Sequence, residues 1–242
     1  MMIRPILLAF IFSIAILPSQ GQKLGDLVGK AKKVLSGEKL TDEEIGAGLK
    51  EALSIGTGEA VEFLSAEDGY YKSIYKIALP EEAQSIVSKL SMVPGFHNLE
   101  SNLVERMNRG AELAAAKAKP IFLSAIKNLT FKDVMRILTG ERDAATRYLQ
   151  STTNDQLYSE FRPIIKAALD EVNATNLWRE AVTAYNKLPL VRQTNPELDD
   201  HVTDKALVGL FSLIEKKEDG IRSDVGQRSS DLLRKVFAQQ DK

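Results

Sequence analysis

The stretch LTGERDAATRYLQSTTNDQLYSEFRPII, from Leu138 to Ile165, decides how the fold is interpreted. It combines a glycine stop, helix-start signals, three arginines and a proline within a pattern that is otherwise helical. Gly140 is placed to end one helix, and Asp143 is placed to cap the next. Thr153 with Gln156 forms a capping box, which predicts a second helix start within the stretch. We therefore expect several short helices to join here.

The functional interpretation of this stretch is an anion-binding site. A helix N-terminus exposes backbone amides, and its dipole favours negative charge. Four arginines would add positive charge if they converge: Arg136, Arg142, Arg147 and Arg162. The candidate ligand-binding residues are Asp143, Thr146, Arg147, Tyr148 and Arg162. The structural alternative is that the arginines pair with Asp143, Asp155 and Glu160 and tie the short helices together, since arginine often closes ion pairs at helix ends.

Apolar residues recur at helical spacing along the rest of the chain, and no segment shows sustained two-residue alternation. Thr41 and Glu44 form a capping box that opens a helix expected to run to about Leu64. Small residues recur on this helix at four-residue intervals: Gly48, Ala52, Gly56 and Ala60. Interior glycines are costly unless something packs against them, so this ridge predicts a close helix crossing.

The remaining pattern predicts further helices and one irregular region. Helix starts are expected at Pro80, Thr130, Thr175, Asp199 or Asp200, and Ser223 or Asp224. One longer helix is expected from Leu99 to Ala118, and Pro120 either kinks it or opens the next helix. Pro163 should bend the helix that contains it. Ile74, Ile77 and Leu79 are assigned to a brief extended piece. The predicted fold class is all-α, a single compact domain of about nine or ten helices, several of them short or proline-kinked.

The N-terminal residues have the pattern of a secretory signal. A short basic start ends at Arg4, an apolar run covers Ile6 to Leu17, and small residues lead up to Gly21. We predict a signal peptide over residues 1–21, cleaved after Gly21. The alternative is a membrane anchor, but the run is shorter than the about 20 apolar residues of a spanning helix. The chain is expected to be exported, to the periplasm or cell envelope, or secreted.

Residues 22–40 are interpreted as an amphipathic segment or a linker before an all-α domain over residues 41–242. From Leu24 to Leu35 the apolar residues keep helical spacing, and Lys30, Lys32 and Lys33 point away from them. Such a segment can make peripheral contact with a membrane surface. The alternative is that it docks on the domain or links it loosely.

Composition excludes several classes of function. The chain has 32 basic and 33 acidic residues, and without Arg4 the net charge is −2 (31 against 33). Nucleic-acid binders normally carry a basic excess, so nucleic acid is not an expected partner. The chain has no cysteine, which excludes disulfides and thiolate metal ligands. One cluster of acidic residues and a histidine has the side chains to bind a metal ion: Asp199, Asp200, His201 and Asp204. Carboxylates in the first turn of a helix need no metal to explain them, so no metal or other cofactor is predicted.

Several segments together resemble a known bacterial family, domain of unknown function 4197. They are GERDAATRYLQSTT with the later FRPII, GLKEALSIGTGEAV, LPEEAQSI, HVTDKALVGLFSLIEKKEDGIRSD and RSSDLLRKVF. The resemblance covers nearly all of the chain after residue 21 and implies a mostly helical exported protein. It supplies no catalytic residues, and an aromatic residue usually stands in that family where this chain has His201.

No nucleophile elbow or local pair of catalytic carboxylates is present in the sequence. The leading hypothesis is a non-enzymatic periplasmic or envelope protein that binds an unknown protein or small molecule through a groove between helices, or acts as a scaffold. The alternative is an enzyme or an anionic-ligand-binding protein that uses the arginine and tyrosine residues between Asp143 and Arg162.

Overall fold

A computed structural model describes residues 40–80, 84, 99–171, 173–187, 189, 190, 193, 195, 197–238 and 241. Within these residues the regular elements are helices, with no strand, so the predicted all-α class is confirmed for the described part. The elements are α2 (Asp42–Ser65), α4 (Leu99–Ala115), α5 (Ala118–Lys127), α6 (Phe131–Leu138), α7 (Ala144–Asp170), α8 (Ala174–Tyr185), α9 (Leu198–Ser223), the short 3-10 helix η1 (Val225–Gln227) and α10 (Asp231–Phe237). The predicted signal peptide, residues 22–39 and most of the helix expected after Pro80 lie outside the described residues.

The first described helix begins where its capping box predicts. The Thr41 hydroxyl accepts a hydrogen bond from the Glu44 amide at 3.2 Å, and the Glu44 carboxylate accepts from the Thr41 amide at 2.9 Å. These bonds satisfy amides that a helix start leaves without partners. The helix ends at Ser65, one residue after the predicted end.

The small-residue ridge of α2 is covered by other helices, as predicted. A Cβ atom on Gly48 would lie 2.6 Å from Val236 Cγ2 of α10, a distance that real Cβ contacts essentially never show. About two turns further along, a Cβ on Gly56 would lie 3.6 Å from the Cβ of Lys217 in α9. The glycine at position 48 is therefore required because α10 lies directly on the backbone of α2.

The predicted helix start at Thr153 is wrong, because α7 runs without a break from Ala144 to Asp170. Thr153 lies inside a buried stripe that recurs every four residues: Ala145, Leu149, Thr153, Leu157, Phe161 and Ile165. Its hydroxyl donates to the Leu149 carbonyl at 2.7 Å instead of capping a helix. Continuous burial of one face decides the structure here. Pro163 is tolerated on the exposed side of the helix.

Three other expected boundaries differ from the structure. The helix from Leu99 ends at Ala115 and not at Ala118. Of the two alternatives for Pro120, the second is confirmed: α5 starts at Ala118 with Pro120 in its first turn, where a proline costs little. Asp199 and Asp200 lie in the first turn of α9 and do not cap it, since the N-cap is Glu197. The last helix does not start at Ser223 or Asp224: α9 continues to Ser223, and α10 starts at Asp231 with Ser230 as its cap.

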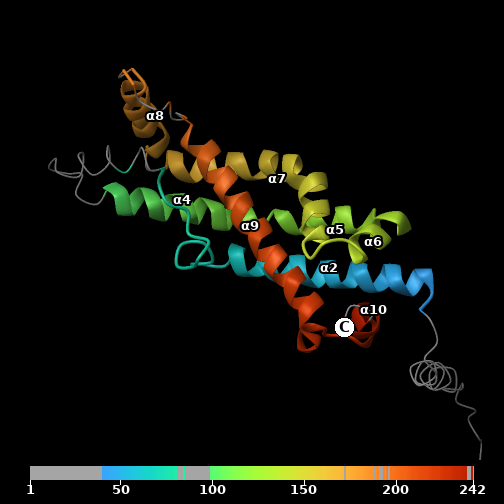
Figure 1. The fold of residues 1–242 in the computed structure, drawn as a ribbon. Helices are drawn as coiled ribbons and strands as arrows, with labels where there is room; N and C mark the ends of the chain where they lie inside the picture. The colour runs from blue at the N-terminus through green and yellow to red at the C-terminus, as the bar shows by residue number, and fades with distance from the viewer. Residues whose placement is uncertain are drawn as a thin grey trace, which may run out of the picture. The chain divides into compact units, whose positions relative to one another are not determined.

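The long helix α9 connects most of the described elements. Figure 1 shows it crossing α7, α4 and α2, and it contacts each of them. It also contacts α8 near its start and is followed by η1 and α10 at its end. α7 packs along both α4 and α9, so the α7–α9 crossing lies at the centre of the packing.

The α2–α10 crossing gives a stability prediction. Gly48→Ala places a methyl group against Val236, whose branched side chain is stiff, and should lower the free energy of unfolding by about 1–3 kcal/mol. The matched control is Gly58→Ala in the same helix, where a Cβ would meet nothing within 4 Å. That substitution should raise stability by about 0.5–1 kcal/mol. Urea unfolding measures both, and equal effects of the two substitutions would contradict the close crossing.

Candidate functional site

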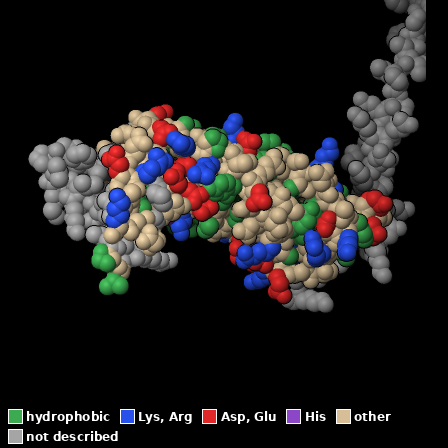
Figure 2. Space-filling model, turned by 90° about the horizontal axis from the view of Figure 1, so that it is seen from above, with side chains coloured by type: hydrophobic (Ala, Val, Ile, Leu, Met, Phe, Trp, Pro, Cys, Tyr) green, Lys and Arg blue, Asp and Glu red, His purple; other side chains and the backbone are tan. Residues whose placement is uncertain are grey.

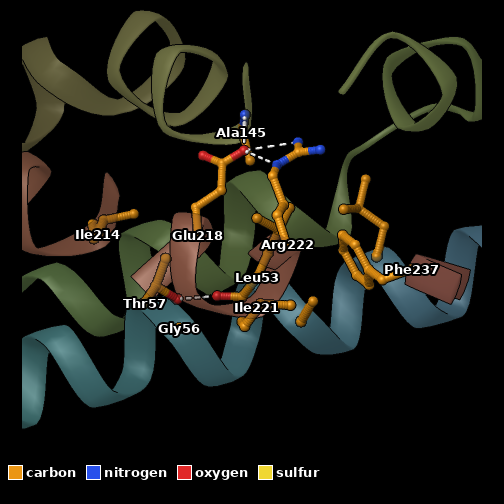
Figure 3. Close-up of a pocket in the computed structure, with 11 residues that line it drawn as sticks. Leu53, Gly56, Thr57, Ala145, Ile214, Glu218, Ile221, Arg222 and Phe237 are labelled. Atoms are coloured by element: carbon orange, nitrogen blue, oxygen red, sulfur yellow. Dashed lines mark hydrogen bonds and ion pairs between the residues drawn. The ribbon is translucent and has the colours of Figure 1, made fainter. Parts of the chain in front are cut away.

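The N-terminus of α7, the predicted anion site, already holds an anion from the protein itself. The carboxylate of Glu218, on α9, accepts hydrogen bonds from the amides of Ala145 at 3.0 Å and Thr146 at 2.8 Å. The Thr146 hydroxyl donates to the same carboxylate at 2.8 Å. Figure 3 shows the Glu218 side chain rising from α9 towards Ala145. An external anion would reach these amides only by displacing Glu218.

Arg222, one turn further along α9, completes this buried cluster. Its guanidinium donates to Glu218 Oε1 through Nε at 2.9 Å and through Nη2 at 2.8 Å. Nη2 also donates to the Ile137 carbonyl at the end of α6, at 2.8 Å. Both side chains are 7% exposed. The cluster therefore ties α6, α7 and α9 together away from water.

A small cavity of about 20 Å³ lies beside the cluster, between α2 and α9. Its lining is almost entirely apolar, with Leu53, Gly56 and Ile221 among the residues that face it in Figure 3. Such a volume has room for about one water molecule. This cavity is therefore a packing defect next to the cluster and is too small for an organic ligand.

The five candidate residues from the sequence do not form one site. Arg147 is 65% exposed and pairs with Asp143 at 2.8 Å, one turn earlier in the chain. Tyr148 lies under a different arginine, with the Arg136 guanidinium 5.8 Å from its ring centroid. Thr146 faces the opposite direction, into the buried Glu218 cluster. The start of α7 thus has one exposed pair and one buried cluster.

Arg162 lies far from the other four residues. It is fifteen residues beyond Arg147 in α7, about 22 Å along the helix at 1.5 Å per residue. Its Nε donates to Asp199 Oδ2 at 2.8 Å, and the side chain of Asp199 is only 2% exposed. The other oxygen of Asp199 is buried and has no hydrogen-bond partner among the described residues. Arg162 is therefore the group that compensates the buried Asp199 carboxylate.

Sequence reasoning missed a second region, the irregular segment from Ala66 to Pro80. One carboxylate oxygen of Glu112, on α4, accepts hydrogen bonds from the backbone amides of Tyr70 at 3.1 Å and Tyr71 at 3.0 Å. Asn108, also on α4, exchanges two hydrogen bonds with the backbone of Ile77, at 2.8 and 2.9 Å. Buried side chains of α4 therefore hold this segment by its backbone.

The same segment is fastened to α9. The Tyr70 hydroxyl donates to the Ala206 carbonyl at 2.8 Å, and burial raises the pKa of this tyrosine, so the hydroxyl keeps its proton. Gly209 permits the approach, because a Cβ there would lie 3.1 Å from Tyr70 Cε1. His201 Nε2 lies 3.2 Å from the Ala78 carbonyl oxygen, and burial lowers the pKa of this histidine.

Within this fixed segment, Ile74 is left 84% exposed. Hollows lie on both sides of it, one of about 900 Å³ towards Pro80 and one of about 520 Å³ towards Phe63. Tyr75 lines both hollows, and its ring meets the ring of Phe63 edge to face with centroids 6.4 Å apart.

The two hollows are also lined by lysines and exposed apolar side chains. The lysines are Lys72, Lys76, Lys205, Lys216 and Lys217. The exposed apolar side chains are Phe63, Ile74 and Val208. We call these eight residues the Ile74 surface. One signal in the sequence could have indicated part of it: Lys205, Val208, Ser212 and Lys216 recur at spacings of three and four residues, which places them on one face of α9.

The electrostatics elsewhere are mixed. Figure 2 shows basic and acidic side chains intermixed over the face that it presents, so no field of one sign covers that face. Among the described residues, no three histidine, aspartate or glutamate side chains gather in a way that would hold a metal ion. Within the same residues, no helix is both long and apolar enough to cross a membrane.

The Glu218 cluster gives a second stability prediction. Glu218→Gln removes the charge that compensates the buried Arg222, and should lower the free energy of unfolding by about 3 kcal/mol. The control is Glu215→Gln, at an exposed position of the same helix, which should change it by less than about 0.5 kcal/mol. Urea unfolding compares the two, and a small effect of both would show that the cluster does not stabilise the helix junction.

The two arginines of α7 give a third prediction. Arg162→Ala leaves the buried Asp199 carboxylate without its cation and should cost about 1–3 kcal/mol of stability. Arg147→Ala breaks an exposed pair and should cost less than about 0.5 kcal/mol. In the double variant Arg162→Ala/Asp199→Asn, part of the loss should be recovered, because no buried charge remains. Equal costs for the two single substitutions would refute this difference between the pairs.

Comparison with known proteins gives one match. No curated protein and no solved structure matches the chain. The model of the family described as protein of unknown function DUF4197 matches residues 39–238, which include every described helix. The resemblance found in the sequence is thereby confirmed, and the chain belongs to the DUF4197 family.

Proposed function

We propose that this chain is an exported, non-enzymatic binding protein of the bacterial cell envelope, and that it binds through the Ile74 surface. Export is supported by the signal-peptide pattern of residues 1–21. The binding role is supported by the way in which the Ala66–Pro80 segment is built.

The observation that carries the proposal is an exposed isoleucine on a segment that is otherwise fixed. Tyr70, Ile77 and Leu79 of this segment are all at most 4% exposed, whereas Ile74 is 84% exposed. Large apolar side chains that gather at a hollow surface and are rimmed by charge mark interaction sites. The segment needs no rearrangement to present Ile74, so little ordering entropy opposes binding.

The arginine and tyrosine stretch between Asp143 and Arg162 supports a different role. The free backbone amides at the start of α7 donate hydrogen bonds to Glu218. Arg147 pairs with Asp143, and Arg162 pairs with Asp199. Groups that are engaged with each other in this way stabilise the fold. We therefore assign the stretch between Asp143 and Arg162 to the joining of helices and the binding role to the Ile74 surface.

Site-specific crosslinking in the intact envelope tests the proposal. A photoreactive side chain in place of Ile74 should give a defined crosslinked product in cells that export the full chain. The matched control is the same side chain in place of Phe131, which is 45% exposed on α6, at the far end of α2 from the Ala66–Pro80 segment (Figure 1). Crosslinks from position 131 that match those from position 74, or none from either, would refute binding through this surface.

The export part of the proposal has its own readout. N-terminal sequencing of the chain recovered from the envelope fraction should begin at Gln22, directly after the predicted cleavage site. Recovery of the chain from the cytoplasmic fraction with Met1 retained would contradict export and leave the crosslinking result to be interpreted separately.

A further inference from the structure

We propose that the Ile74 surface binds the headgroup region of a membrane that contains anionic phospholipid. The inference rests on the proposed function and gives it a ligand class. Ile74 would enter the headgroup layer, and the lysines around it would meet the negative charge of the lipids.

The apolar part of the surface is suited to shallow insertion. Phe63, Ile74 and Val208 are 50%, 84% and 62% exposed. Single exposed apolar residues are ordinary in proteins, but these three border two hollows that share Ile74. Ile74 lies in a turn that α4 and α9 hold from behind through Glu112 and Tyr70. Its side chain can therefore leave water without any change of the backbone.

The charged part of the surface has free cations. Lys72 pairs with Asp68 at 2.9 Å, and Lys217 pairs with Glu59 at 2.6 Å. The three others, Lys76, Lys205 and Lys216, have no ion-pair partner within the part of the chain that the structure describes. Lys76 lies 4.9 Å from the ring centroid of Tyr71. Three uncompensated positive charges therefore surround the exposed isoleucine.

The choice of lysine favours a lipid surface over a protein partner. All five cations of the surface are lysine, although the chain uses arginine for its buried and paired contacts at Arg162, Arg222 and Arg228. The cores of protein interfaces are enriched in arginine and depleted of lysine. A single phosphate or carboxylate is also held best by the bidentate fork of arginine. Lysine is a hydrated point charge on a flexible stem, which suits the diffuse potential of an anionic leaflet.

The stripe on α9 extends this charge along one line. Lys205, Val208, Ser212 and Lys216 are exposed and lie on one face of the helix at spacings of three and four residues. From Lys205 to Lys216 the stripe covers about 16 Å at 1.5 Å per residue. Two lysines at this separation can contact different lipid headgroups, whereas a small anion would contact only one.

Vesicle flotation with the full chain after signal removal tests the inference. The chain should float with vesicles in which a third of the phosphatidylcholine is replaced by phosphatidylglycerol, and should not float with phosphatidylcholine alone. Ile74→Asp should weaken binding at least about tenfold, because an acidic group replaces the inserted apolar one. The double variant Lys205→Gln/Lys216→Gln should weaken binding about thirtyfold at low salt, and the difference should vanish at high salt.

Matched variants at α5 and α6 serve as controls. Phe131→Asp changes another exposed apolar side chain, and Lys119→Gln/Lys132→Gln removes two exposed lysines. Both should bind vesicles as the unchanged chain does. All four variants alter exposed positions, so their unfolding midpoints should agree with that of the unchanged chain.

Three outcomes would overturn the lipid assignment. The chain does not float with the phosphatidylglycerol vesicles; the control variants lose binding as strongly as the Ile74 surface variants; or binding survives in both surface variants and disappears when residues 24–35 are deleted. Crosslinks from position 74 to a protein or small molecule, without vesicle binding, would overturn the lipid assignment and leave the proposed function intact. The absence of both crosslinks and vesicle binding would overturn both.

Discussion

A helix that begins inside a protein has backbone amides without partners, and in this chain the carboxylate of Glu218 supplies the partner at the start of α7. The same carboxylate compensates the charge of Arg222, and Arg222 also donates a hydrogen bond to the carbonyl of Ile137 at the end of α6. Removing Glu218 would leave donors of two helices, α7 and α9, unsatisfied at once. The crossing of α7 and α9 depends on this one buried group, and the other helices pack around that crossing.

Local signals in the sequence were reliable where the decisive contact is local. The bonds between Thr41 and Glu44 join residues three apart, and so do those between Thr130 and Asp133, so each helix start could be read directly. The ridge at Gly48 was also readable, since an interior glycine implies a close neighbour even when that neighbour is not known. The identity of that neighbour, Val236, needed the structure.

The sequence failed where burial over a long range decides the outcome. Thr153 and Gln156 have the residues of a capping box, but the buried stripe from Ala145 to Ile165 keeps α7 continuous. Glu218 is seventy-two residues from Thr146, so no local pattern pairs them. The exposure of Ile74 is likewise a result of how Glu112 fixes its segment. The sequence places Ile74 with Ile77 and Leu79 in one piece of chain, and only the structure separates the exposed Ile74 from the other two, which are buried.

The molecule separates its two kinds of charged contact. Glutamate, aspartate and arginine form the buried or half-buried pairs. Arg162 of α7 pairs with Asp199 of α9, and the Glu218–Arg222 pair within α9 binds backbone groups of α7 and α6. Lysine stays at the surface and gathers around Ile74. This division explains why the most irregular stretch of the sequence is not the part that faces a partner in our proposal. The charged groups of that stretch join helices, and the separate segment from Ala66 to Pro80 carries the exposed isoleucine.

The two long helices α7 and α9 are joined at two separate points, and this limits how the length between those points can change. Thr146 and Arg162 of α7 are sixteen residues apart, and they bind Glu218 and Asp199, which are nineteen residues apart on α9. Each added residue shifts a helix by 1.5 Å and turns it by about 100°. A single insertion between the two attachment points would therefore carry one partner off its face while the other stays bound. Homologues of this chain should accumulate insertions in the loops and hold the residue count within these two segments constant.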